Sequence, residues 1–236
     1  MRDLSIAVAQ PPCTALDVAA NARAHAAEVR AARSRVVVFP ELSLTGYELA
    51  APLLDPADPR LRPLVEACAA TGSIALAGAP IDGPHIGMLR VDGTSVTVAY
   101  RKQNPGPVEA GRFRPGPCPE VLQVDGWRLG LAICRDTGMA GHAAATARLG
   151  IDAYLAGLTD LPHEDVIQEE RARRIAGDHH VWVGFASFAG PTGSGFPQTA
   201  GRSGIWSPDG TSVARAGRTP GELARATLTR FSPVIR

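Results

Sequence analysis

The sequence has no excess of charge and no long apolar run, and each absence argues against a class of protein. Its 24 lysines and arginines nearly balance its 23 aspartates and glutamates, which leaves a net charge of +1. A balanced chain lacks the strongly basic surface of most nucleic-acid-binding proteins, so we expect no nucleic-acid partner. No apolar stretch approaches the roughly 20 residues that cross a membrane, so we expect no membrane partner.

The sequence also lacks paired cysteines, and its first residues do not resemble a signal peptide. Its four cysteines are scattered, with no CxxC pair, at Cys13, Cys68, Cys118 and Cys134. This pattern indicates reduced thiols rather than a disulfide framework or a zinc site. The first residues, Met1–Ser5, lack the apolar core of a signal peptide. Together these features predict a cytoplasmic protein.

Two polar segments could suggest a cofactor, but neither has the required spacing. Asp178, His179 and His180 are adjacent on a predicted helix, where their side chains point apart, and no HExxH pattern is present. The segment Gly193–Gly195 fits neither a P-loop nor GxSxG, which argues against a nucleotide site and a serine hydrolase. The surrounding Gly190–Gly201 is rich in Gly, Pro, Ser and Thr, and it predicts a mobile surface loop.

What the chain does contain is an alternation of apolar runs and helical stretches, which predicts an α/β fold. The pair Asp92-Gly93 predicts a hairpin, and a second hairpin about residues 208–210 indicates that the sheets are mixed. With no linker or repeat, residues 1–236 are expected to form one domain. The predicted helices are Leu16–Arg33 (with Thr14 as a possible cap), Arg60–Thr71, Ala140–Leu149 and Glu164–His179. The predicted strands are Leu4–Gln10, Arg35–Phe39, Ser73–Ala79, Met88–Val91, Thr94–Arg101, Trp127–Ile133, Ala153–Ala156, Val181–Ser187, Gly204–Ser207 and Ser212–Ala216.

Three reactive side chains of different types follow predicted strands. Glu41, Lys102 and Cys134 come in this order along the chain. A cysteine is a strong nucleophile once a base takes its proton, a carboxylate can be that base, and an ammonium can stabilise an oxyanion. A backbone N–H just after the nucleophile, that of Arg135, could be a second oxyanion donor. The three side chains therefore suggest covalent hydrolysis at one edge of a sheet.

Each of the three also has a simpler interpretation. A lone cysteine at a strand end is most often a packing residue, because free cysteine is among the most buried residue types. Glu41 could be a solvated loop carboxylate, and Lys102 a charged strand end. Residue types alone leave both interpretations open.

Three motifs in order resemble those of the carbon–nitrogen hydrolase family, also called the nitrilase superfamily. The first is Val36–Tyr47, around Glu41. The second runs from Tyr100 through Lys102 and Glu109 to the segment Phe113–Gly116. The third is Leu129–Asp136, around Cys134. The segments Ala7–Pro11, Gly201–Ile205 and Ser207–Gly210 also fit, so the resemblance spans nearly the whole chain.

The resemblance implies a mechanism and an architecture. Cys134 would attack the carbonyl or nitrile carbon, Glu41 would move the protons, and Lys102 with the Arg135 N–H would hold the oxyanion. Glu109 would hold Lys102 in place and contact substrate. The implied fold is a four-layer α-β-β-α sandwich with two mixed sheets, in a homodimer or higher homo-oligomer that forms through helices. No metal or organic cofactor is implied.

The chain departs from the family after the nucleophile. The usual Phe-Pro-Glu and the arginine three positions later are replaced by Met139, Ala140, Gly141 and Ala144. Joint loss of both charges avoids leaving one of them buried and unpaired, which suggests a remodelled wall. His142 lies on this predicted helix and could contact substrate, although a histidine on a helix surface is the commoner case. Tyr47, at the end of the first motif, is the other candidate for a substrate contact.

The function expected is hydrolysis of a small linear amide or N-carbamoyl compound through a cysteine thioester, with release of ammonia or an amine. Nitrile hydrolysis and acyl transfer on the same three residues are alternatives within the enzymes. A binding scaffold that kept the fold without catalysis is the alternative outside them. The sequence does not name the substrate, because its pocket would be built from loops.

Overall fold

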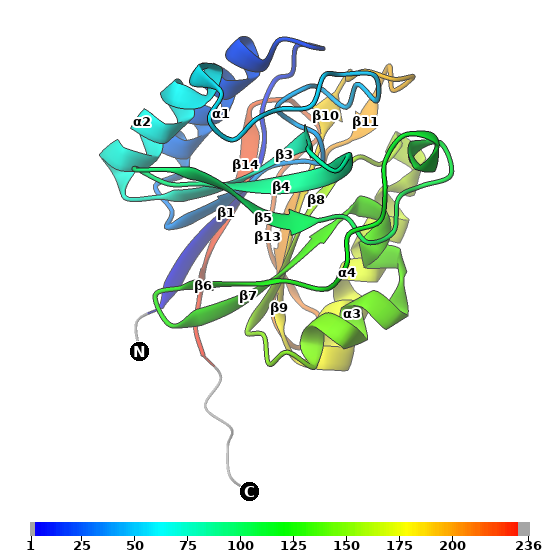
Figure 1. Ribbon diagram of the computed structural model, residues 1–236. Coiled ribbons are helices and arrows are strands. Elements are labelled where there is room, and N and C mark those ends of the chain that lie inside the picture. Colours follow the sequence, from blue (N-terminus) through cyan, green and yellow to red (C-terminus); the bar gives the residue numbers. More distant parts are fainter. Residues whose placement is uncertain (1–2, 231–236) are drawn as a thin grey trace, which may run out of the picture.

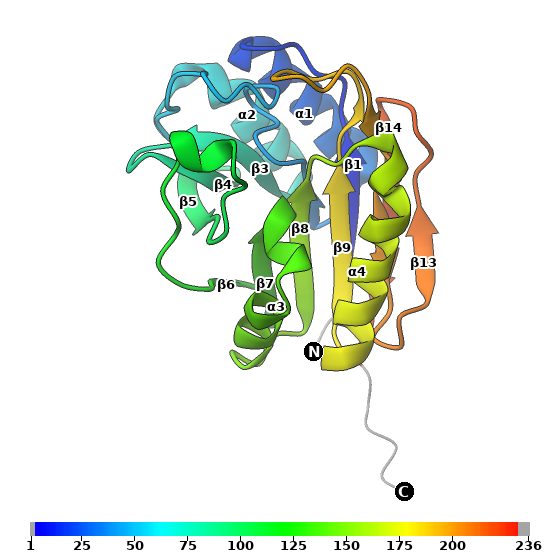
Figure 2. The ribbon, with the colours of Figure 1, turned by 90° about the vertical axis from the view of Figure 1, so that its right-hand side faces the viewer.

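Two six-stranded sheets lie face to face, and helices cover the outer side of each (Figures 1 and 2). The computed structural model describes residues 3–230. The first sheet has the strand order β14-β1-β2-β3-β4-β5, and the second has the order β13-β12-β9-β8-β7-β6. Both sheets contain parallel and antiparallel pairs. The predicted four-layer α-β-β-α sandwich with two mixed sheets is therefore confirmed.

The strands of each sheet differ in length. Those of the first sheet are β1 Leu4–Gln10, β2 Val36–Val38, β3 Ile74–Ile81, β4 His85–Val91, β5 Val96–Arg101 and β14 Glu222–Leu228. Those of the second are β6 Val121–Val124, β7 Trp127–Ile133, β8 Ala153–Leu158, β9 Trp182–Ser187, β12 Gly204–Trp206 and β13 Ser212–Arg215. A separate short pair joins β10 Ala189–Gly190 to β11 Thr199–Ala200.

The packing divides into three apolar clusters, which explains why the central strands have few polar residues. One cluster lies between the sheets and includes Ile6, Leu131 and Leu155. A second joins the first sheet to the helices α1 Val18–Ala32 and α2 Arg62–Thr71. The third joins the second sheet to α3 Ala140–Ala147 and α4 Asp165–His179. Strands buried on both faces read as continuous apolar runs, and the valines of β2 are an example.

Parallel strands bring their carboxyl ends to the same edge of each sheet. In the first sheet β1, β2 and β3 are parallel, and in the second β7, β8 and β9 are parallel. The residues that follow β2, β7 and β8 therefore meet where the edges of the two sheets come together. Side chains that follow such strands are the usual material of a binding site in α/β proteins.

Most predicted elements form, with ends that differ by a few residues, but some expectations were wrong. The first helix is capped by the Asp17 side chain, which accepts a hydrogen bond from the Ala20 N–H at 2.9 Å, and not by Thr14. The strands β6 and β14 and the pair β10–β11 were missed. The hairpin at Asp92 forms as predicted, because β4 and β5 pair antiparallel around it.

The segment Gly190–Gly201 lies on the surface and is tied down at several points. Thr192 donates a hydrogen bond to the Gly46 carbonyl at 2.6 Å, and the Leu49 N–H donates to the Ser194 hydroxyl at 2.9 Å. These contacts dock the segment on the end of the first motif and on the residues just after it. Among the described residues, none of the helices has the length and apolar character needed to cross a bilayer.

Candidate active site

A turn after β2 carries Glu41 into the space between the two sheets, and two glycines make room for it. A Cβ on Gly78 of β3 would lie 2.3 Å from the Leu42 nitrogen. A Cβ on Gly157 of β8 would lie 2.5 Å from the Phe39 carbonyl oxygen. Real Cβ atoms do not approach other atoms this closely, so each sheet needs a glycine at this point. The close approach fixes Glu41 at the junction of the sheets.

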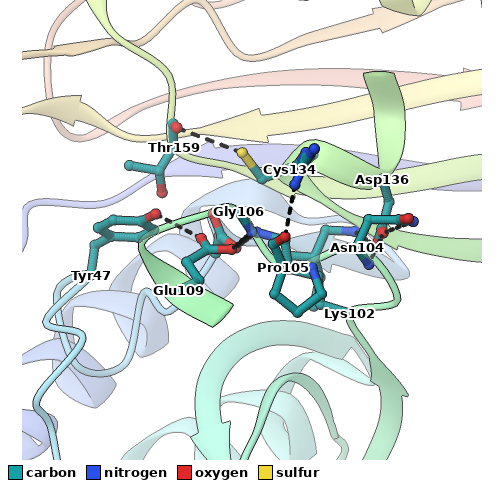
Figure 3. A network of polar contacts seen from close by, with 12 residues as sticks. Tyr47, Lys102, Asn104, Pro105, Gly106, Glu109, Cys134, Asp136 and Thr159 are labelled. Carbon is teal, nitrogen blue, oxygen red and sulfur yellow. Dashed lines mark hydrogen bonds and ion pairs between the residues drawn. The ribbon is translucent and has the colours of Figure 1, made fainter. Parts of the chain in front are cut away.

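Lys102 follows β5 and lies between two buried carboxylates. Its Nζ is 2.6 Å from Glu41 Oε1 and 2.6 Å from Glu109 Oε2. The three residues are between 1% and 4% exposed. Glu109 also accepts hydrogen bonds from the Gly106 N–H at 2.5 Å and from the Tyr47 hydroxyl at 2.7 Å (Figure 3). The ammonium is thus held by two partners, one of which is itself fixed by two further donors.

The electrostatics of this cluster shift the pKa values of the two carboxylates in opposite directions. Burial alone would raise the pKa of Glu109, but the Lys102 ammonium and the hydrogen bonds hold it below its usual value. Burial raises the pKa of Glu41 to about 8; Lys102 opposes the rise and the Glu109 charge adds to it. Burial would lower the pKa of Lys102, but the charges of Glu41, Cys134 and Glu109 raise it. One carboxylate stays ionised, and the other can exchange a proton near neutral pH, which suits a general base.

Cys134 follows β7 and opens the 3-10 turn Cys134–Gly138. Its φ angle is +42°, in the left-handed region that residues other than glycine rarely adopt. This backbone conformation directs the residue out of the strand. The thiol lies 3.6 Å from the Thr159 carbonyl oxygen, which follows β8 (Figure 3). Glu41 Oε2 is buried and has no hydrogen-bond partner among the described residues, and the Cys134 thiol is close enough to lower the pKa of Glu41.

The resting thiol is held in its neutral form. Burial raises the pKa of Cys134 well above its ordinary value, the negative charges of Glu41 and Asp160 raise it further, and Lys102 opposes them. A thiol in this environment becomes a nucleophile only when a base removes its proton as it attacks. The structure thus brings Glu41, Lys102 and Cys134 together, with Glu109 behind the lysine.

Two candidates from the sequence, Arg135 and Tyr47, lie beside these residues. Arg135 follows Cys134, and its guanidinium donates to the Pro105 carbonyl at 2.9 Å, which ties the cysteine turn to the lysine loop. The role of its backbone N–H stays a prediction. Tyr47 is 8% exposed and packs edge to face against Phe196, with ring centroids 5.1 Å apart. Its role as a substrate contact also stays a prediction.

His142 is in neither of the two expected environments. It is 5% exposed, so it is not a surface histidine of the helix. Its Nε2 lies 2.9 Å from the Tyr100 hydroxyl and its Nδ1 lies 2.9 Å from the Tyr154 hydroxyl. Because both ring nitrogens have protein partners, neither is free for a substrate. The role of His142 as a substrate contact stays a prediction, which these two contacts disfavour.

The segment after the nucleophile departs from the family pattern, and the structure shows what surrounds the changed residues. Met139, which precedes α3, is 40% exposed, and nothing lies within 4 Å of a Cβ on Gly141. The Arg171 guanidinium of α4 lies 3.4 Å from the position of a Cβ on Gly138. An arginine from α4 therefore lies against the cysteine turn at Gly138, and the space beside Gly141, where the family glutamate would stand, is open.

Sequence reasoning missed two acidic residues of this region. Asp136 is fully buried within the turn that Cys134 opens. Asp160 is 5% exposed; its Oδ1 lies 3.9 Å from Arg171, and its Oδ2 has no hydrogen-bond partner among the described residues. The signal for Asp160 was its place two residues after a strand that is parallel to the cysteine strand.

The described part of the chain contains no group of three His, Cys, Asp or Glu side chains placed to hold a metal ion. Asp178 and His179 end α4, and His180 caps it with a left-handed backbone. The charged groups at the junction of the sheets are occupied with one another, and the chemistry available there is that of a thiol, a carboxylic acid and an ammonium.

Comparison with known proteins gives matches over nearly the whole chain. Residues 5–231 match the profile of the carbon-nitrogen hydrolase family. A curated protein of Pseudomonas protegens, described as a hydrolase in the pqqF 5′ region, is 27% identical over 230 residues, covering 92% of this chain and 80% of its own length.

Solved structures share the fold at lower identity. An alanine mutant of an amidase of the nitrilase superfamily from Nesterenkonia AN1 superposes with a TM-score of 0.84 at 23% identity, over 95% of this chain and 90% of that one. A mutant of the same amidase in complex with butyramide has a TM-score of 0.83 at 23% identity, over 95% and 90% of the two chains. Nit3 of Saccharomyces cerevisiae has a TM-score of 0.83 at 21% identity, over 96% and 90%.

Proposed function

The chain belongs to the carbon–nitrogen hydrolase family, and we propose that it cleaves the C–N bond of a small linear amide or N-carbamoyl compound through a thioester on Cys134. The observation that carries the proposal is the placement of Lys102 between Glu41 and Glu109, with the second oxygen of Glu41 unpartnered beside the thiol. This arrangement supplies a nucleophile, a base and a cation at one point.

In the proposed acylation, Glu41 takes the thiol proton of Cys134 as the sulfur bonds to the carbonyl carbon. The Lys102 ammonium and the Arg135 N–H hold the negative charge that develops on the carbonyl oxygen. Glu41 then gives its proton to the leaving nitrogen as the C–N bond breaks, and ammonia or an amine departs. A raised Glu41 pKa suits both steps, because the group must accept and then donate a proton.

In the proposed deacylation, a water molecule attacks the thioester and passes a proton to Glu41. The C–S bond breaks, and the proton returns to the sulfur, which leaves the acid product and the resting enzyme. Glu109 keeps Lys102 in place through both steps, because it is itself fixed by Gly106 and Tyr47.

The amide is preferred over the nitrile because a structural relative is an amidase that binds butyramide. Nitrile hydrolysis and acyl transfer use the same three groups and remain alternatives. A scaffold without catalysis is disfavoured, because it would have no use for a buried lysine held by two carboxylates.

The proposed function is tested by ammonia release from a panel of small amides, N-carbamoyl amino acids and nitriles. Wild type is compared with Cys134→Ala, and with Cys118→Ala as a control that removes an exposed thiol. Release that requires only Cys134, with an acyl adduct on its peptide in the mass spectrum, supports the proposal. An adduct without ammonia indicates acyl transfer, and neither product nor adduct from any compound contradicts it.

We further propose that the protein is cytoplasmic and assembles as a homodimer or higher homo-oligomer through its helices. Val166 and Ile167, at the start of α4, are large apolar residues that are 71% and 43% exposed, and Met139 before α3 is 40% exposed. Large apolar residues that are exposed on the outer helices are candidates for such an interface. Sedimentation of wild type beside Val166→Glu tests this assembly, and a wild-type monomer at all concentrations contradicts it.

A further inference from the structure

A chain of buried polar side chains lies behind the nucleophile and takes no part in the proposed reaction. The Tyr154 hydroxyl is 2.9 Å from His142 Nδ1, His142 Nε2 is 2.9 Å from the Tyr100 hydroxyl, and that hydroxyl is 2.8 Å from Asp136 Oδ2. All four residues are at most 5% exposed. They come from β8, α3, β5 and the cysteine turn, so the chain of contacts links both sheets.

The direction of every proton in this chain follows from Asp136. Its Oδ1 accepts from the Asn104 backbone N–H at 2.9 Å and from the Asn104 side-chain amide at 2.8 Å. Its Oδ2 accepts from the Ile133 N–H at 3.1 Å and from Tyr100. Four donors match the four acceptor sites of an ionised carboxylate. The Tyr100 hydroxyl therefore donates to Asp136.

The remaining protons are then fixed in turn. Since Tyr100 has given its only proton to Asp136, its oxygen can only accept, and His142 Nε2 must carry a proton and donate it. A neutral imidazole has one N–H, so Nδ1 accepts from the Tyr154 hydroxyl. Burial lowers the pKa of His142, although the Asp136 charge opposes this, and a neutral ring is consistent with the contacts.

Asp136 joins the two segments that carry the reactive groups. Ile133 immediately precedes Cys134, whose backbone is in a strained conformation, and Asn104 lies two residues after Lys102 (Figure 3). One carboxylate therefore holds the thiol turn against the lysine loop. A shift of about 1 Å between reacting groups can lower a rate a hundredfold, so this bridge matters for the chemistry.

We propose that His142 is a positioning residue, held as the Nε2–H tautomer between Tyr154 and Tyr100, and that it fixes Asp136 and so the placement of Cys134 relative to Lys102. The expected effect of His142 on kcat rests on the proposed function, but the tautomer of His142 and its effect on the Cys134 thiol do not. His142 lies on α3, the helix from which the charged pair of the family is missing. The chain of buried polar side chains therefore stabilises the cysteine turn without that pair.

The tautomer is tested by nitrogen NMR of the histidine rings in the full-length protein, with His142→Gln used for assignment. The structure offers an internal control in His25. Its Nδ1 is 2.6 Å from the Asn21 carbonyl, which can only accept, so Nδ1 carries the proton and Nε2 accepts from the Ser43 hydroxyl at 2.8 Å. We expect opposite tautomers for the two buried rings. A proton on Nδ1 of His142 would overturn the proposal.

The positioning role is tested with His142→Leu, His142→Gln and the double variant His142→Leu with Tyr154→Phe. The leucine variant leaves the Tyr154 hydroxyl buried without a partner and should be less stable, whereas the double variant removes that hydroxyl and should regain stability. In both we expect kcat to fall about tenfold with KM changed less than about twofold, because Tyr100 has lost the His142 donor and keeps the Gln103 N–H, at 3.3 Å. Glutamine can donate and accept, and it should restore most of kcat.

The alkylation rate of Cys134 by iodoacetamide, followed on its peptide, is measured in the same variants. It reports the thiol environment even if no amide is hydrolysed, so failure of the proposed function is separable from failure of this proposal. We expect the rate to change in the leucine and double variants and to stay near wild type with glutamine. A double variant with wild-type kcat and wild-type alkylation would show that His142 only fills space.

Discussion

The two sheets contribute opposite kinds of groups to the site. The first sheet and its loops hold Glu41, Lys102 and Glu109, which bond one another at 2.6 Å. The second sheet holds Cys134, whose thiol lies 3.6 Å from the Thr159 carbonyl oxygen, and Asp160, whose Oδ2 has no partner among the described residues. Charge is therefore held on one side by an ion-pair network around Lys102, although Glu41 Oε2 has no hydrogen-bond partner among the described residues, and the thiol on the other side is sparsely bonded. Each prediction below disturbs one side or the junction.

The largest effect is expected from Lys102→Met, which breaks the ion-pair network that joins Glu41 and Glu109. Two buried carboxylates would face each other without their shared cation, and the loss of one partner from a buried pair costs about 3–5 kcal/mol. Urea unfolding measures this cost. The triple variant that adds Glu41→Gln and Glu109→Gln should recover much of the stability and no ammonia release. Equal stability of Lys102→Met and wild type would contradict the pairing.

The junction between the sheets is tested by Gly157→Ala. Its new methyl group would lie 2.5 Å from the Phe39 carbonyl oxygen and push on the Glu41 turn. Overpacking of this kind costs about 1–3 kcal/mol, and we expect thermal unfolding at a lower temperature together with reduced turnover. Gly177→Ala on α4 is the matched control, because nothing lies within 4 Å of its Cβ. The control should be neutral or more stable, since alanine favours a helix interior.

The difference between the pKa values of Glu41 and Glu109 predicts how activity depends on pH. The Glu41 carboxyl has a pKa of about 8, so activity that needs it deprotonated should rise with pH around that value. The Glu109 charge contributes to the raised value, so Glu109→Gln should move this rise to lower pH by about one unit. A profile of kcat/KM against pH for both proteins measures the shift. A rise at the same or a higher pH in the variant would contradict it.

The smallest effect is expected on the sparsely bonded side, from Asp160→Asn. The Asp160 charge raises the pKa of the Cys134 thiol, so its removal should speed alkylation of that thiol by about threefold. Burial raises the pKa of Asp160 itself to about 6, so the difference between the proteins should shrink below that pH. Asp178→Asn removes the same charge from an exposed position on α4 and serves as the control.

The fold was predictable from the sequence where the signal was local. The valines of β2 read as a buried strand, and Asp92 marks a hairpin, because both depend on neighbouring residues. The strand β14 was not predictable, because its short mixture of polar and apolar residues forms a strand only through pairing with β1 at the other end of the described chain. The cap of α1 failed for a related reason, since Thr14 and Asp17 are both suitable and only the path of the backbone selects one.

The candidate site divides in the same way. The chain order of Glu41, Lys102 and Cys134 and their places after strands allowed the prediction that they meet, and the structure brings them together. The environment of His142 could not be predicted, because its two tyrosine partners come from different sheets. The unpartnered oxygen of Asp160 could not be predicted either. It depends on whether any segment that packs beside it places a hydrogen-bond donor there, which the sequence does not reveal.

The left-handed backbone of Cys134 affects which substitutions selection for stability would favour at this position. A residue with a side chain at φ +42° stores about 1–2 kcal/mol that glycine would release. Replacement by glycine would thus relieve the strain, but it would also remove the thiol and the packing of a side chain that lies against two apolar clusters. A laboratory screen that scores only stability would weigh strain against packing and would take no account of the reactive thiol. Retention of cysteine at this position therefore has to be maintained by what the thiol does.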